Sequence, residues 1–243
     1  MSKSIGKAVN SNTTRLHLTA GSHASRDEGT CALEMVAWLS GAPHTDRPTG
    51  VCPIIAAFVR GINDSANEST RDELIPHLTV LIGTIDPAMQ QSRNEFFAWQ
   101  AIHAAGVVLR GEGKNRFGRF LGASTTLEEA RGRAERIREI MRGREKGVER
   151  HFTPIDRALY HAHRAANCAL WFARSSHLPF GGATSMTPET ASADSSASVF
   201  AIAFELGIAE AWSMALQATG AAAGLENGAA HRWHQTECDR HGK

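Results

Sequence analysis

The chain has 243 residues, of which 42% are hydrophobic and 21% are charged, and its formal net charge is +1. These values are ordinary for a protein with a substantial hydrophobic core, and they exclude binding to nucleic acid or anionic lipid that depends on a large net charge. No apolar run reaches the roughly 18 residues of a membrane-spanning helix. The N-terminus has no apolar signal-peptide core, and the four cysteines have irregular spacing, so we expect a cytoplasmic protein with reduced thiols.

The N-terminal part of the chain carries few structural signals. Apolar and polar residues alternate only at 14–19, which predicts one short strand at most. Thr30 has the residue type of a helix N-cap, and an apolar run follows it through residues 31–40. Gly41 comes directly after that run and is typical of a helix end. The first predicted helix therefore covers residues 31–40.

Helix signals then follow one another along the middle of the chain. Pro53 suits the first turn of a helix, which predicts one over residues 53–64. Thr70 and Glu73 have the spacing of a capping box and precede a third apolar segment. The remaining predicted helices begin at Asp86-Pro87, at the capping box of Thr125 and Glu128, at Thr153-Pro154 and near Ala197, with a Ser/Thr/Gly/Pro-rich loop from Ser175 to Ser196.

These patterns predict an all-α protein, folded as a single-domain bundle of six or seven helices. Residues 1–20 are expected to be a flexible segment, residues 21–220 to form the helical domain, and residues 221–243 to be a polar tail. No second core is visible in the sequence, and no repeat of 20 to 50 residues is present.

A cluster of chemically active residue types lies between residues 23 and 52. Cys31 is expected in the first turn of its helix, where unpaired N–H groups favour a thiolate, and Glu34 lies three residues on, on the same face. The set consists of His23, Cys31, Glu34, His44, Asp46 and Cys52. Such residues bind zinc or iron, or carry out nucleophilic chemistry.

The same residues carry a resemblance. The pattern Gly21-x-His23, Gly29-x-Cys31-x-x-Glu34, Asp46-x-Pro48 and Cys52-Pro53 is similar to the N-terminal segment of a widespread family of bacterial hypothetical proteins. The resemblance covers roughly residues 16 to 84. It implies a bacterial source and a helical architecture, and it implies no reaction.

The cluster has two readings. In one, the polar residues form a structural bracket: cysteine is commonly buried as a small hydrophobe, and the carboxylates cap helices or brace turns. In the other, His23, Cys31 and Cys52 hold zinc together with Glu34 or Asp46, although this spacing matches no standard zinc module. A cysteine hydrolase based on Cys31 is the weakest version, because such enzymes usually place the histidine on a sheet.

Three further motifs are weaker. The tail places His231, His234, Cys238 and His241 on one helical face, but ten residues span roughly 15 Å, so the four cannot share one ion. His161, Arg164 and Cys168 align on another helix and are expected to be packed or solvated. Residues 111–122 mix cations with Phe117 and Phe120, which we read as a connecting loop, because the next helix mixes glutamates with arginines.

The sequence therefore favours a helical binding protein over an enzyme, by a small margin. The expected partner is a protein or a small molecule, a homo-oligomer is an open alternative, and membranes are not expected. A nucleic-acid partner that binds through residues 111–122 is the third and least favoured option. The alternative is a metal- or thiol-dependent enzyme that acts on a small molecule through Cys31 and Glu34. The absence of a phosphate loop, a dinucleotide fingerprint and a metalloprotease pair decides between them.

Overall fold

The computed structural model describes residues 16–144, 153–175 and 190–225. Within these ranges the chain is all-helical, with nine α-helices, three short 3₁₀ helices and no strand. The all-α prediction is confirmed. The predicted count of six or seven helices is wrong, and the short strand at 14–19 is absent from the described part, which begins at residue 16.

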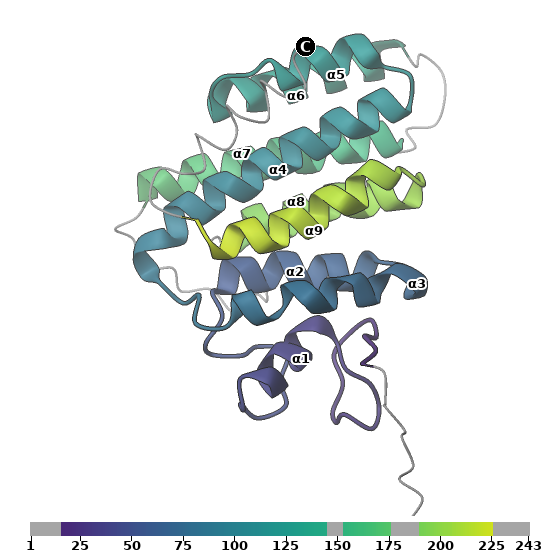
Figure 1. Cartoon of the computed structure of the whole chain (residues 1–243). Coiled ribbons are helices and arrows are strands. Elements are labelled where there is room, and N and C mark those ends of the chain that lie inside the picture. The colour runs from purple at the N-terminus through teal and green to yellow at the C-terminus, as the bar shows by residue number, and fades with distance from the viewer. Residues whose placement is uncertain (1–15, 145–152, 176–189, 226–243) are drawn as a thin grey trace, which may run out of the picture.

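The helices lie in a stack, and most of them cross Figure 1 in a similar direction. The α-helices are α1 (Ala32–Leu39), α2 (Pro53–Ser65), α3 (Glu68–Arg71), α4 (Gln90–Gly111), α5 (Asn115–Gly122), α6 (Leu127–Arg144), α7 (Pro154–Ser175), α8 (Ala191–Glu205) and α9 (Ala209–Ala223). The 3₁₀ helices are η1 (Asp72–His77), η2 (Thr79–Leu81) and η3 (Pro87–Met89).

The core forms around α4, which packs against α5, α7 and α8. Three fully buried phenylalanines join α2, α4 and α8: the ring of Phe58 lies 4.5 Å from that of Phe97 and 5.7 Å from that of Phe200. The buried face of α7 is mostly alanine, which lets the neighbouring helix backbones approach closely. Large rings on one side and small residues on the other therefore fill this core.

The helix count differs from the prediction because one predicted helix is divided, and because α5 forms within residues 111–122, which we expected to be a connecting loop. The segment predicted as 197–219 forms α8 and α9, which meet at Gly207 with a φ of +68°. Such a positive φ favours glycine and ends an α-helix. The segment after Thr70 forms only 3₁₀ turns, and Pro76 lies inside one of them. Proline removes a backbone N–H donor, so a continuous α-helix is disfavoured there.

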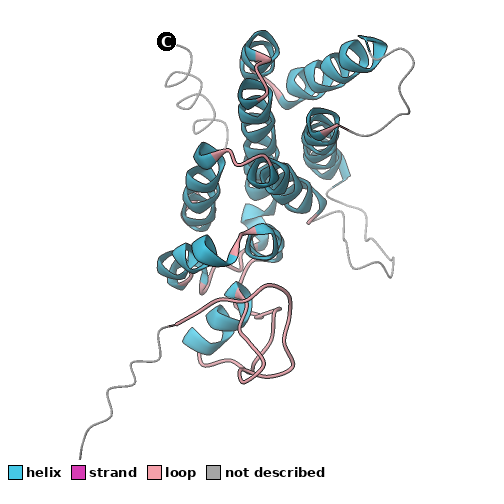
Figure 2. Ribbon diagram, turned by 90° about the vertical axis from the view of Figure 1, so that its right-hand side faces the viewer, coloured by secondary structure: helices cyan, strands magenta, loops and turns pink. Residues whose placement is uncertain are grey.

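The N-terminal segment is mostly loop and lies below α2, as the pink ribbon in Figure 2 shows. Its one helix, α1, packs against α2 and η2. Leu18 comes from the stretch that we expected to be flexible, and it is fully buried in the core. Residues 16–52 are therefore attached to the helical stack from their beginning. No helix among the described residues is long and apolar enough to cross a membrane.

Candidate functional site

The site begins at the first turn of α1, where Cys31 and Glu34 cap the helix for each other. Cys31 is the N-cap, and its Sγ accepts the N–H of Glu34 at 3.5 Å. In return, Glu34 Oε2 accepts the N–H of Cys31 at 2.8 Å. This is a capping box in which a thiol replaces the usual hydroxyl. The predicted cap, Thr30, is one residue too early.

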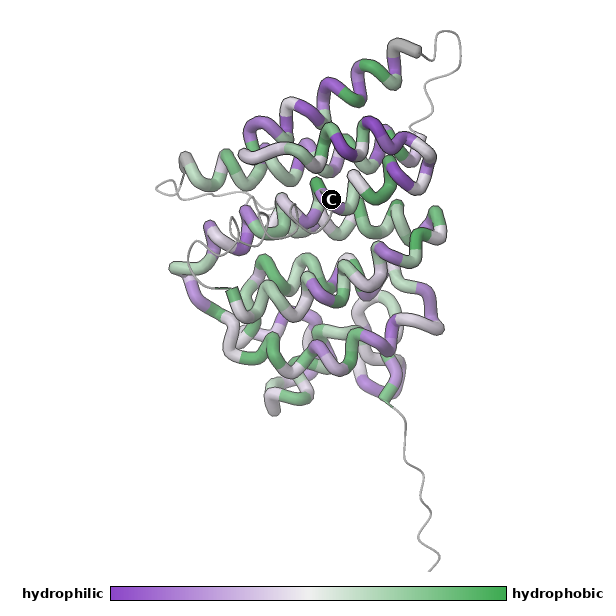
Figure 3. The backbone as a smooth tube through the Cα atoms, turned by 45° about the horizontal axis from the view of Figure 1, so that its top comes forward, coloured by the Kyte–Doolittle hydropathy of each residue, from purple (hydrophilic) through white to green (hydrophobic). Residues whose placement is uncertain are grey.

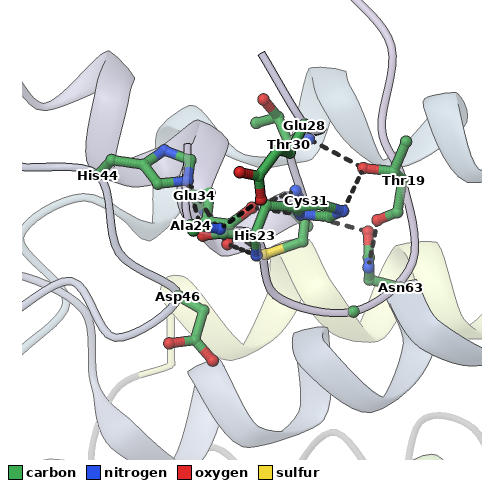
Figure 4. Close-up of polar contacts among 12 residues, drawn as sticks. Thr19, His23, Ala24, Glu28, Thr30, Cys31, Glu34, His44, Asp46 and Asn63 are labelled. Carbon is green, nitrogen blue, oxygen red and sulfur yellow. Dashed lines mark hydrogen bonds and ion pairs between the residues drawn. The ribbon is translucent and has the colours of Figure 1, made fainter. Parts of the chain in front are cut away.

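The carboxylate of Glu34 also holds the loop that precedes α1. Oε1 accepts the backbone N–H of His23 at 2.6 Å, and Oε2 accepts Nδ1 of the same residue at 2.9 Å. Figure 4 shows Glu34 and His23 facing each other, with Cys31 beside them. Because Glu34 is 1% exposed, water does not replace these bonds when one is lost. The loop and the helix are therefore joined through one buried carboxylate.

Hydrogen bonding sets the charge of Glu34. Burial by itself would raise the pKa of the carboxyl group, but the N–H groups of Cys31 and His23 outweigh it and lower the pKa below its ordinary value. Glu34 is therefore ionised at neutral pH. With three N–H groups bonded to its two oxygens, it is poorly suited to act as a general base.

His23 continues the network to Thr19. Its Nε2 lies 3.1 Å from Thr19 Oγ1, which also accepts the N–H of Thr30 at 2.8 Å. The order hydroxyl, imidazole, carboxylate is that of a catalytic triad. However, Gly29 packs so closely that a Cβ on it would stand 2.6 Å from Thr19 Oγ1 and from the His23 ring. The hydroxyl is thus occupied and covered, and the chain of bonds fixes the ring of His23.

His44 approaches the same carboxylate from the loop after α1. Its Nε2 lies 3.1 Å from the backbone oxygen of His23 and 3.7 Å from Glu34 Oε1. Its other ring nitrogen, Nδ1, is buried and has no hydrogen-bond partner among the described residues. The loop on each side of α1 therefore contributes one histidine to the surroundings of Glu34.

Two of the predicted metal ligands lie elsewhere. Asp46 contacts Arg60, with Oδ2 at 3.4 Å from Nε, and Figure 4 shows its carboxylate pointing away from the network. Cys52 is buried in the core at the start of α2, where its N–H donates to Thr84 Oγ1. Across the described ranges, no three His, Cys, Asp or Glu side chains are placed to hold one metal ion. The zinc prediction therefore gains no support from these side chains.

Asn63 is the part of the network that sequence reasoning missed. Its Oδ1 accepts the N–H of Ala32 at 3.2 Å, and its Nδ2 donates to the backbone oxygen of Thr19 at 3.0 Å. The neighbouring Asp64 accepts the N–H of Gly21 at 2.8 Å. No spacing in the sequence indicates these contacts, because Asn63 lies 31 residues from Ala32. Through Asn63 the end of α2 holds the N-terminal segment.

The thiol of Cys31 is expected to be inert. Burial raises its pKa to about 12, and the nearby carboxylate of Glu34 adds to the rise. We predict that Cys31 reacts with iodoacetamide at neutral pH about tenfold or more slowly than Cys168, which is only partly buried. Peptide mapping by mass spectrometry measures both rates. Equal rates at the two cysteines would contradict the prediction and restore Cys31 as a reactive thiol.

Two further sequence motifs are the histidine-rich tail and the histidine face of α7. His231, His234, Cys238 and His241 lie outside the described residues. His161 lies on α7, where burial, with Arg164 and Arg157 nearby, lowers its pKa to about 4. It is therefore neutral at pH 7, as expected for a packed helix-face histidine.

Comparison with known proteins finds no match for this chain. The chain matches no protein-family model, no curated protein and no solved structure.

Proposed function

We propose that this chain is a helical binding protein that docks a protein partner through an N-terminal apolar surface. We define this surface by five side chains on α1 and on the segment 80–85. They are Trp38, Leu39 and Ile82, each 40% exposed, Val80 at 50% and Ile85 at 56%. Because α1 packs against η2, the two groups lie on neighbouring segments. Large apolar side chains that are exposed next to one another are typical of interaction sites, whereas single exposed apolar side chains are common on any protein surface.

The contact between Arg26 and Trp38 favours a protein partner. The guanidinium of Arg26 lies 3.9 Å from the centre of the Trp38 ring. Tryptophan and arginine are enriched among the residues that contribute most to protein–protein binding. An aromatic side chain that is already held in place loses less conformational entropy when a partner binds. The pair is therefore a preorganised anchor within the proposed interface.

The buried network supports this arrangement from below. Arg26 lies in the loop that His23 ties to Glu34, and Trp38 lies near the end of the helix that Glu34 caps. One carboxylate thus fixes both members of the Arg26–Trp38 pair relative to each other. This gives the polar cluster the role of a bracket for a docking surface.

The same contacts weigh against the alternative function, a metal- or thiol-dependent enzyme. A thiol with a pKa of about 12 is protonated at neutral pH and is a poor nucleophile. The Glu34 carboxylate is engaged by Cys31 and His23. The binding function requires neither group to be reactive.

Site-specific photo-crosslinking tests the proposal. Benzoylphenylalanine is placed at Leu39 and, as the matched control, at Tyr160, which is also 40% exposed but lies on α7. After irradiation in the native host, we expect a specific protein adduct at position 39 and none at position 160. The crosslinked protein is then purified, and its affinity is measured for the wild type, Trp38→Ser and Tyr160→Ser.

We expect Trp38→Ser to weaken binding by about 30-fold, the effect of losing about 2 kcal/mol at an interface anchor. Tyr160→Ser should bind as the wild type does. Adducts of equal yield at the two positions, or unchanged affinity of Trp38→Ser, would overturn the proposal. A crosslink to a second copy of this chain would also overturn it and assign the surface to self-association.

A further inference from the structure

The short helix α5 presents a basic face to solvent. Gly118 is buried against α4, where a Cβ on it would lie 3.1 Å from the backbone oxygen of Gly106, so the two helices pack closely. Arg116, Arg119 and Phe120 stand at i, i+3 and i+4 and are all exposed on the opposite side. Lys114, at the start of the helix, is exposed as well. We call Lys114, Arg116, Arg119 and Phe120 the α5 basic face.

Two of the four glutamates of α6, Glu129 and Glu135, pair with arginines of the same helix. The sequence predicts a field of mixed sign in this region, because α6 carries acidic residues beside its arginines. In the structure, several of these charged residues form ion pairs within α6 or between α6 and the start of α7. The ion pairs are Arg133–Glu129, Arg138–Glu135, Arg138–Asp156 and Arg142–Asp156.

The cations of α5 differ from those of α6. Within the described parts of the chain, Lys114, Arg116 and Arg119 form no ion pair. The helix itself contains no acidic residue, and Glu112 is the nearest one before it in the sequence. α5 thus carries a localised positive charge, although the net charge of the whole chain is only +1. Local charge of this kind binds anions that the net charge does not reveal.

An aromatic platform lies beside the cations. Phe120 is 40% exposed, and the guanidinium of Arg133 lies 4.7 Å from the centre of its ring. Arg133 is held there because it also donates to the backbone oxygen of Phe120 and pairs with Glu129. Nucleic-acid bases stack on aromatic rings and on arginine planes, while phosphates contact the surrounding cations.

We propose that the α5 basic face binds single-stranded nucleic acid. Arg116 and Arg119 contact neighbouring phosphates, Lys114 contacts a further one, and a base stacks at Phe120. The combination distinguishes a nucleic acid from an acidic peptide, which would need the cations but not the ring. This binding site is separate from the proposed docking surface, since α5 and α1 lie at opposite ends of the stack in Figure 1. In Figure 3 the helices at the top of the view, where α5 and α6 lie, carry long hydrophilic stretches.

Fluorescence anisotropy with a labelled deoxythymidine oligonucleotide tests the proposal. With about three phosphate contacts, the logarithm of the binding constant should fall with the logarithm of the salt concentration with a slope of about −2. The double variant Arg116→Ser/Arg119→Ser should bind about tenfold more weakly and reduce the slope to about −0.7. Phe120→Ala should weaken binding about fivefold or more and leave the slope unchanged.

A matched control removes the same charge elsewhere. Arg47→Ser/Arg157→Ser changes an exposed arginine of the N-terminal segment and a partly exposed arginine of α7, and it should bind the oligonucleotide as the wild type does. If it weakens binding as much as the α5 double variant, binding depends on net charge and the proposal is overturned.

Salt-independent binding, no binding, or equal affinity of the wild type and Phe120→Ala would overturn the proposal too. Polyglutamate or anionic vesicles could also compete with the oligonucleotide equally well on the wild type and on Phe120→Ala. That result would assign the face to polyanions in general and overturn the proposal. The α5 variants leave residues 16–85 unchanged. A negative result for nucleic-acid binding therefore leaves the docking proposal untouched, and the two proposals can fail separately.

Discussion

Replacing Glu34 by alanine is expected to lower the free energy of unfolding by about 3–5 kcal/mol. The carboxylate is 1% exposed and accepts the N–H groups of Cys31 and His23 as well as Nδ1 of His23. Without it, buried donors lose their partners, and the loop before α1 loses its attachment. Urea denaturation followed by circular dichroism measures the change, and the denaturation midpoint should fall with it.

The control for this variant is Glu139→Ala. Glu139 is an exposed residue of α6, so its replacement should change the free energy of unfolding by less than about 0.5 kcal/mol. If Glu34→Ala costs no more than this control, the polar cluster is not a bracket. The buried carboxylate would then be expected to bind a ligand or a metal ion, which is the second reading of the cluster in the sequence.

The pH dependence gives a second test of the same carboxylate. Because folding lowers the pKa of Glu34, its contribution is fully present above the unfolded pKa of about 4.3 and is lost as the pH falls through the lower, folded pKa. The wild type should therefore lose stability more steeply than Glu34→Ala when the pH falls below about 4.3. Denaturation curves at a series of acidic pH values measure both slopes, and parallel slopes would contradict the assignment.

Helix positions were predictable where local signals were strong. Pro53 begins α2 as expected, and the long pattern after Asp86 becomes α4. The predicted loop from 175 to 196 is wrong at its end, because α8 begins at Ala191. The serines there have the composition of a loop, but Ser192 is fully buried, and its single hydroxyl proton is shared between the backbone oxygens of Asn94 and Ala165, at 3.0 and 3.1 Å from Oγ. Tertiary hydrogen bonds override the local preference of serine for turns.

The candidate site was predictable only as far as one helix turn extends. Cys31 and Glu34 meet because residues three apart share a helix face, and this was visible in the sequence. His23 and His44 belong to the same group as expected, but Asp46 and Cys52 do not, because they contact Arg60 and Thr84 instead. The direction of a loop side chain depends on contacts such as these, which spacing does not encode. The same holds for α5, whose exposed face depends on how Gly118 packs.

Replacing Gly61 by alanine is the second large change that we expect. Gly61 lies on α2 where it packs against α8, and a Cβ at this position would stand 2.5 Å from the Cβ of Ala197. Neither atom can rotate away, because both are fixed to helix backbones. The two helices must separate, at the point where Phe58 and Phe200 are in contact. Overpacking of this kind costs about 1–3 kcal/mol.

Gly132→Ala is the matched control for Gly61→Ala, because both glycines lie inside α-helices. A Cβ at Gly132 on α6 meets nothing within 4 Å. Alanine has the higher helix propensity, so this variant should raise the free energy of unfolding by up to about 1 kcal/mol. The two substitutions are chemically identical and are expected to shift the urea midpoint in opposite directions. Stabilisation by Gly61→Ala would mean that α2 and α8 are free to move apart, and that the N-terminal segment joins the helical stack less tightly than the contacts of α2 indicate.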